Sequence, residues 1–65
     1  MFDLYTVDTR ELVYAFESLQ DLIEVTREIQ DDAYLENLMI FSPEGKILIG
    51  LDVVSLMRGE PPEWK

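Results

Sequence analysis

Five carboxylates recur at helical spacing in the first half of the chain. They are separated by four, three, four and three residues: Glu17, Asp21, Glu24, Glu28 and Asp31. On an α-helix this spacing places side chains along one face, about 4.5 to 6 Å apart in rise, comparable to the phosphates along a nucleic-acid strand. The row predicts a phosphate-like surface for the basic groove of a nucleic-acid-binding protein. The alternative is an ordinary solvated acidic face.

Few other side chains in this sequence offer chemistry. The chain contains no cysteine and no histidine, which removes thiolate metal ligands and the commonest general base. Its serines have no histidine to activate them, and the acidic pair Asp31 and Asp32, with Glu36 nearby, does not match the spacing of a calcium loop. We therefore expect a protein that is not an enzyme and that holds no cofactor and no metal.

The net charge indicates which classes of partner the protein can bind. With 14 acidic and 5 basic residues the net charge is -9, which disfavours direct contact with nucleic acid or with an anionic membrane and favours a basic protein partner. Maintaining solubility is the competing explanation of this charge. The hydrophobic content of 48% is too high for a disordered acidic segment. No membrane-spanning run and no leader-like start occur, so we expect a cytoplasmic protein.

Which elements carry the acidic row depends on whether residues 11–17 form a strand or the start of a helix. Residues 2–7 alternate and are rich in β-forming types, which predicts a first strand. Residues 11–17 fit either a strand or the start of one long helix, because Leu12, Phe16 and Leu19 also fall on a helical stripe. Val13 and Tyr14 favour a strand, and Ser18 with Asp21 has capping-box spacing. We therefore predict a hairpin through "DTR", then a helix from Leu19 to about Asp31.

The clearest local signal is the stretch "ENLMIFSPEGKILIGL". Two β-rich runs flank "SPEG", in which Pro43 sets the turn and Gly45 supplies a positive φ. A hairpin is expected here, after a short connection that contains Tyr34. The segment "DVVSLMRG" then predicts a short helix with Asp52 at its N-cap and Gly59 as its stop.

Both faces of the second hairpin are apolar, and one helix covers only one face. The short helix is expected to cover part of the second face, and the remainder is expected to be an interface. A homodimer is therefore predicted through four apolar residues: Met39, Phe41, Leu48 and Val54. In the tail "EPPEWK", Trp64 either folds back onto the sheet or is offered to a partner.

The sequence thus predicts an α+β fold of the order ββαββ. It comprises a four-stranded antiparallel sheet with one main helix on one face and a short C-terminal helix, forming a single domain over residues 1–59 with an extended tail over residues 60–65. The predicted function is that of a small acidic protein-binding module. The most specific version of this prediction is an inhibitor whose carboxylate row mimics the phosphates of nucleic acid. Phage-type inhibitors of defence proteins are comparable in type only. The alternative is a homodimeric structural or assembly protein.

Overall fold

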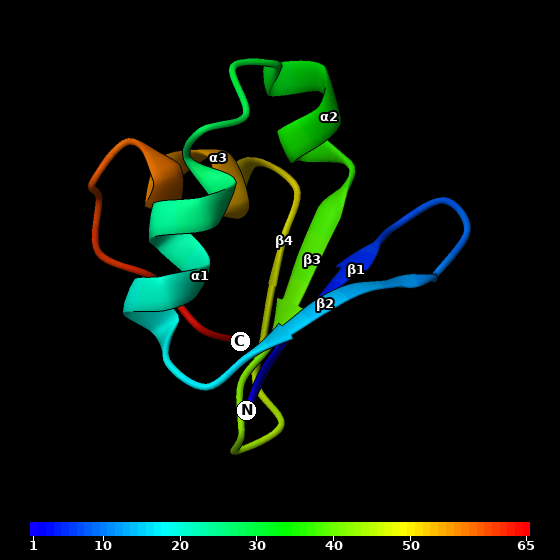
Figure 1. Ribbon diagram of the computed structural model, residues 1–65, viewed down its shortest axis with the longest axis vertical. Coiled ribbons are helices and arrows are strands. Elements are labelled where there is room, and N and C mark those ends of the chain that lie inside the picture. Colours follow the sequence, from blue (N-terminus) through cyan, green and yellow to red (C-terminus); the bar gives the residue numbers. More distant parts are fainter.

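The chain folds as an α+β unit around one antiparallel sheet. The computed structural model describes residues 1–65, with strands β1 (Phe2–Thr6), β2 (Leu12–Phe16), β3 (Leu38–Phe41) and β4 (Ile47–Ile49), and helices α1 (Leu19–Thr26), α2 (Asp32–Glu36) and α3 (Leu51–Met57). The four strands lie in the order β2-β1-β3-β4, and every neighbouring pair is antiparallel (Figure 1). The predicted fold class is confirmed.

The first hairpin resolves the ambiguity of residues 11–17 in favour of a strand. Phe2 of β1 pairs with Phe16 of β2, and the register shifts beside Leu4 and Tyr5, where β2 carries a bulge. The connecting turn is tied by its own side chains, since the two hydroxyls of Thr6 and Thr9 lie 2.6 Å apart.

Helix α1 begins where the capping signal predicts it. Ser18 has an extended backbone, and its Oγ accepts a hydrogen bond of 3.1 Å from the backbone N–H of Asp21. The helix ends at Thr26, however, and not near Asp31 as predicted. Val25 and Thr26 are β-branched and disfavour helix, and no basic residue in the last turn stabilises the dipole there.

The segment predicted as a short connection forms a helix of its own. Asp31 caps α2, because its Oδ1 accepts from the backbone N–H groups of Ala33 (3.1 Å) and Tyr34 (3.4 Å). An N-cap residue needs a non-helical backbone, and Asp31 has φ -125 and ψ 100. This cap therefore separates α2 from α1.

The second hairpin forms as predicted around Ser42–Gly45. The backbone N–H of Gly45 donates to the carbonyl of Ser42 (3.0 Å), and Gly45 has φ +85. After β4 the chain turns directly into α3 at Gly50, whose φ of +63 suits glycine. Gly50 is the N-cap, so the helix starts one residue before Asp52, which lies in the first turn and not at the cap as predicted.

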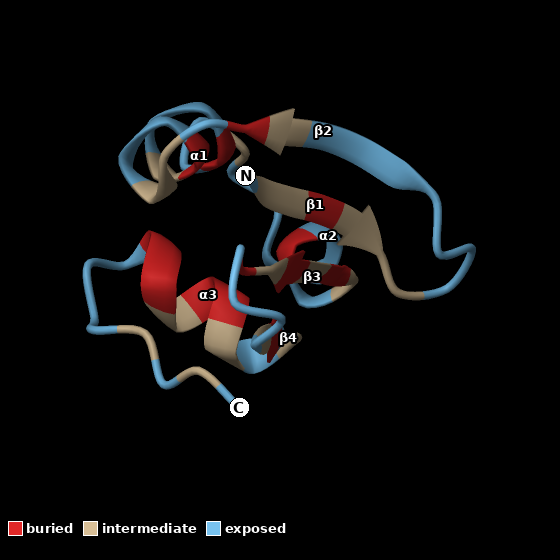
Figure 2. Cartoon of the chain, turned by 90° about the horizontal axis from the view of Figure 1, so that it is seen from below, coloured by how far each residue is buried: buried red, intermediate tan, exposed pale blue.

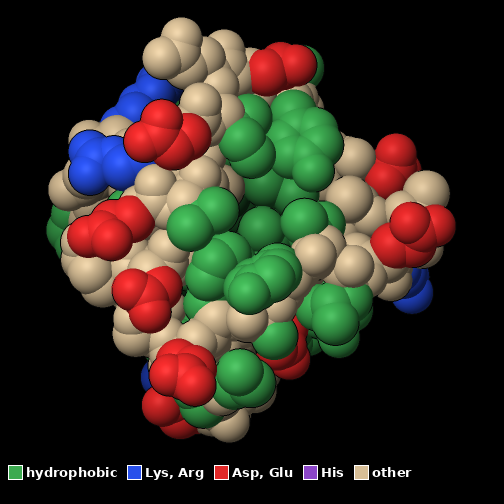
Figure 3. All heavy atoms as spheres, in the orientation of Figure 1, with side chains coloured by type: hydrophobic (Ala, Val, Ile, Leu, Met, Phe, Trp, Pro, Cys, Tyr) green, Lys and Arg blue, Asp and Glu red, His purple; other side chains and the backbone are tan.

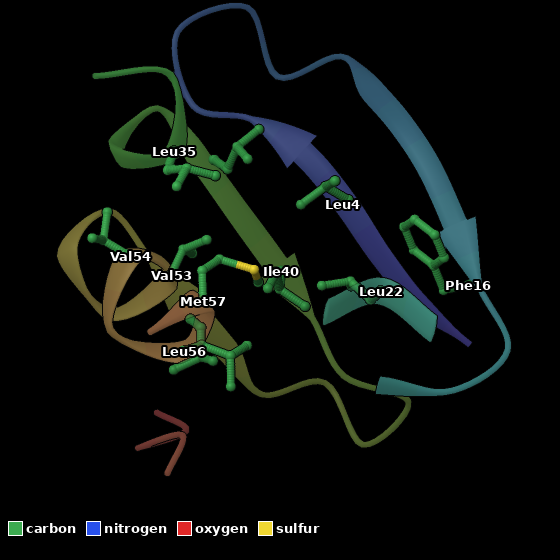
Figure 4. Packing of buried hydrophobic residues seen from close by; sticks show 11 residues of the cluster. Leu4, Phe16, Leu22, Leu35, Ile40, Val53, Val54, Leu56 and Met57 are labelled. Carbon is green, nitrogen blue, oxygen red and sulfur yellow. The ribbon is translucent and has the colours of Figure 1, made fainter. Parts of the chain in front are cut away.

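Helix α3 lies on the same face of the sheet as α1, and the prediction that it covers the second face is wrong. Figure 2 shows both helices on one side of the sheet. Leu4 and Ile40 are paired neighbours on that face, and the buried side chains of both helices converge on them (Figure 4). The core comprises eleven buried residues: Leu4, Phe16, Leu22, Leu35, Leu38, Ile40, Leu48, Val53, Val54, Leu56 and Met57.

The tail, residues 60–65, has no helix or strand but returns to the sheet. Trp64 packs against the core with its ring 6.1 Å from that of Phe2, so it folds back. The backbone of Lys65 exchanges two hydrogen bonds with Ile47 of β4, of 3.0 and 3.1 Å. The tail therefore lies along the outer edge of β4. No helix in the structure has the length and apolar content needed to cross a bilayer.

Candidate functional site

The five predicted acidic residues are all exposed, but they do not share one helix face. Glu17 lies in the link between β2 and α1, and Asp21 lies in the first turn of α1. Glu24 is on the helix and accepts a hydrogen bond of 3.1 Å from Gln20. Glu28 follows the end of α1, and Asp31 is occupied as the cap of α2. The predicted continuous row is therefore wrong, because α1 is only eight residues long.

An apolar groove lies between α1 and β2. Eight of its eleven lining residues are hydrophobic, and the space-filling view shows this apolar surface hollowed between the two elements (Figure 3). The hydrophobic lining comes from the N-terminal strands, α1 and the segment after it: Met1, Leu4, Val13, Tyr14, Ala15, Phe16, Val25 and Ile29.

The groove is open because α1 covers β2 incompletely. Of the five residues of β2, only Phe16 is buried, and the side chain of Tyr14 is 61% exposed beside it. The two rings lie 4.8 Å apart. On the helix side Val25 is 59% exposed, although it is apolar. Large apolar side chains from two elements thus remain in contact with solvent along one depression.

The charged side chains that line the groove are both negative. They belong to Glu17 and Asp21, and no lysine or arginine is among the lining residues. In Figure 3 further Asp and Glu side chains flank the apolar surface on the α1 side. A cation within about 4 Å of such an exposed carboxylate gains roughly 1 to 4 kcal/mol of Coulomb energy before desolvation and entropy costs. The groove therefore combines apolar contact area with attraction for cations.

One polar atom beside the groove has no partner. Thr26 lines the groove and is buried, and its Oγ1 makes no hydrogen bond. A buried hydroxyl without a partner carries a desolvation cost.

Comparison with protein-family models, curated proteins and solved structures finds no match for this chain.

A second apolar surface lies on the face of the sheet opposite the helices. Tyr5, Val7, Met39, Phe41 and Ile49 line a shallow hollow there together with Arg10. The rings of Tyr5 and Phe41 meet edge to face at 5.4 Å. The predicted interface residues Met39 and Phe41 lie on this face and are half-buried.

The other two predicted interface residues belong to the core. Leu48 is 1% exposed and Val54 is 5% exposed. Leu48 pairs with Ile40 across β3 and β4 and therefore shares the helix-covered face, and Val54 lies on α3, which covers that face. Their assignment to the interface is wrong, because neither side chain is accessible.

Sequence reasoning missed the residues of β2 that form the groove. Leu12, Val13 and Tyr14 are three successive exposed apolar residues, whereas a half-buried strand would place a polar residue among them. That run was the available signal. No group of three or more acidic side chains gathers as metal ligands would.

Proposed function

We propose that the chain is a non-catalytic protein-binding module that holds a basic, partly apolar segment of another protein in the groove between α1 and β2. The observation that carries this proposal is that the carboxylates of Glu17 and Asp21 line an apolar groove in which no lysine or arginine side chain lies. Apolar contact supplies affinity, and the two carboxylates select a cationic segment and orient it. The net charge of -9 adds long-range attraction.

If the partner is a nucleic-acid-binding protein, the proposed binding would inhibit it. A nucleic-acid-binding protein whose basic segment occupies this groove would have that segment withheld from nucleic acid. Glu24 and Glu28 contribute to the negative potential beside the groove. Asp31 has a structural role as a cap in addition to its charge. The cytoplasm is the proposed location, and cell fractionation tests it.

Neutralising the two groove carboxylates tests the proposal. The variant Glu17→Gln/Asp21→Asn keeps the size of both side chains, and its matched control Glu44→Gln/Glu60→Gln removes two exposed carboxylates outside the groove. Each chain is immobilised and exposed to lysate at low and at high salt, and the retained proteins are identified. We expect a basic partner that the natural chain and the control retain at low salt and that the variant holds roughly 2- to 30-fold more weakly. Equal retention by all three chains would contradict the proposal.

A second candidate function is assembly through the uncovered sheet face. The observation that favours it is the apolar surface around Tyr5, Met39 and Phe41, which no helix of the chain covers. Sedimentation equilibrium at micromolar concentration tests this candidate with Met39→Lys as the disrupting variant. A dimer that this variant dissociates would support assembly, and a monomeric natural chain would refute it.

A further inference from the structure

The two outer edges of the sheet differ in whether they are covered. At the β4 edge, the backbone of Lys65 exchanges hydrogen bonds with Ile47 in both directions. At the other edge, β2 pairs with β1 and has no strand on its far side. Unpaired edges normally carry charges, prolines or bulges that discourage pairing with another chain. Here β2 has a bulge beside Val13, yet Leu12, Val13 and Tyr14 are exposed and apolar.

The groove follows this open edge. Its lining includes the last four residues of β2, Val13 to Phe16, and Glu17 in the link that follows. Successive side chains of a strand point to opposite faces of the sheet, so a depression that touches all four reaches the edge of the strand. Leu4 of β1 also lines it, so the groove extends from that edge onto the helix-covered face. In Figure 3 the apolar surface lies between β2 and α1, beside the free edge of β2. A free strand edge offers unpaired backbone N–H and C=O groups, with which an extended segment can pair and a helix cannot.

We infer that the basic partner segment binds as an extended strand added to the free edge of β2. This inference rests on the proposed function and names its binding mode. Backbone hydrogen bonds to β2 supply affinity, and the apolar side chains of the added strand enter the groove beside Tyr14 and Val25. Glu17 and Asp21 lie at the end of the groove where β2 leads into α1, so the lysine or arginine of the segment sits at that end. The bulge confines regular pairing to the Tyr14–Phe16 part of the edge, next to these carboxylates.

A cationic partner fits this edge better than a second copy of the chain. Two copies joined through β2 would bring together molecules that each carry a net charge of -9. Like charges brought together in this way oppose association.

The test uses a short synthetic peptide in which lysine and valine alternate, with binding to the full chain followed by calorimetry at low salt. Two further peptides carry N-methyl groups on every second amide, in the two possible frames. Only one frame points its amides at β2, because alternate N–H groups of a strand face opposite sides. We expect methylation in that frame to weaken binding about tenfold or more and methylation in the other frame to have little effect. Hydrogen exchange should show new protection in β2.

Two exposed β-residues provide matched variants of the chain. Tyr14→Thr removes an apolar side chain of the groove and should weaken binding of the alternating peptide, whereas Ile49→Thr, on the opposite face, should not. Equal loss in both methylated frames, tighter binding of a peptide with the same residues at helical spacing, or no binding of the alternating peptide would each overturn the strand-addition inference. The proposed function fails separately, if neutralising Glu17 and Asp21 leaves partner retention unchanged.

Discussion

Thr26 is the buried polar side chain whose hydroxyl finds no partner. It is 1% exposed in the last turn of α1, where valine has the same shape without the hydroxyl. Thr26→Val should therefore raise the free energy of unfolding by about 1 kcal/mol, measured by urea denaturation. Thr6→Val is the matched control with the opposite sign, because the Thr6 Oγ1 accepts from the backbone N–H of Glu11 (3.2 Å) and contacts the Thr9 hydroxyl. Destabilisation by Thr26→Val would show that the hydroxyl is satisfied in solution.

Asp8, in the turn between β1 and β2, has a carboxyl group whose pKa is lowered by hydrogen bonds. The Asn37 side chain and the backbone N–H of Thr9, at 2.7 Å, hold the pKa of Asp8 below its ordinary value of 3.8. Folding therefore favours the ionised form, so the stabilisation from Asp8 is present above about pH 3.8 and is lost as the pH falls through the lower folded value. A carboxyl-carbon NMR titration should give a midpoint below 3.8, and Asn37→Ala should raise it. An unchanged midpoint in that variant would exclude Asn37 as the main cause.

At the scale of the elements, α1 owes its start to one side chain. Ser18→Ala removes the hydrogen bond to the backbone N–H of Asp21, leaving that donor to water. The substitution should lower the free energy of unfolding by about 1 kcal/mol, measured by thermal melting. Ser18→Asn keeps an acceptor at the cap and should restore most of the stability. If both variants melt alike, the cap is not what fixes the start of the helix.

The same helix shows what sequence patterns could and could not predict. The Ser18 cap and the Pro43–Gly45 turn were predictable, because each depends on residues within a few positions of one another. The end of α1 was not, because the apolar stripe continues to Ile29 while the cap at Asp31 and the β-branched Val25 and Thr26 stop the helix earlier.

The placement of the elements in space was the second feature that the sequence could not predict. Leu48 and Val54 are apolar at positions that suit either face, and only the packing of α3 beside α1 places them in the core. The groove also depends on which face of the sheet the helices cover. With both long helices on one face, α1 leaves Val13 and Tyr14 exposed, and no local pattern specifies how far a helix covers an edge strand.

At the scale of the whole molecule, electrostatic repulsion from a net charge of -9 destabilises a fold that only a small core of eleven buried residues stabilises. The two ion pairs, Arg58 with Asp32 at 2.9 Å and Lys65 with Asp52 at 3.9 Å, are exposed or partly exposed and offset little of the repulsion. Added sodium chloride should therefore raise the melting temperature by a few degrees, because it screens like charges. Glu24→Lys/Glu28→Lys carries less net charge and should show a smaller rise. A melting temperature that falls with salt in the natural chain would contradict this account.

The hydrogen bonds between Lys65 and Ile47 determine whether the sheet has one or two free edges to which another chain could add a strand. Cutting the chain after Glu60 would leave β4 as open as β2, and a subunit with two complementary open ends can add copies indefinitely. The shortened chain should form fibres that bind thioflavin and scatter light. The full chain with Trp64→Ala loses the packing on Phe2 but keeps the backbone pairing, and should remain free of fibres. The five residues after Glu60 would then act as a terminator of polymerisation, a role that belongs to the backbone of the segment and not to its side chains.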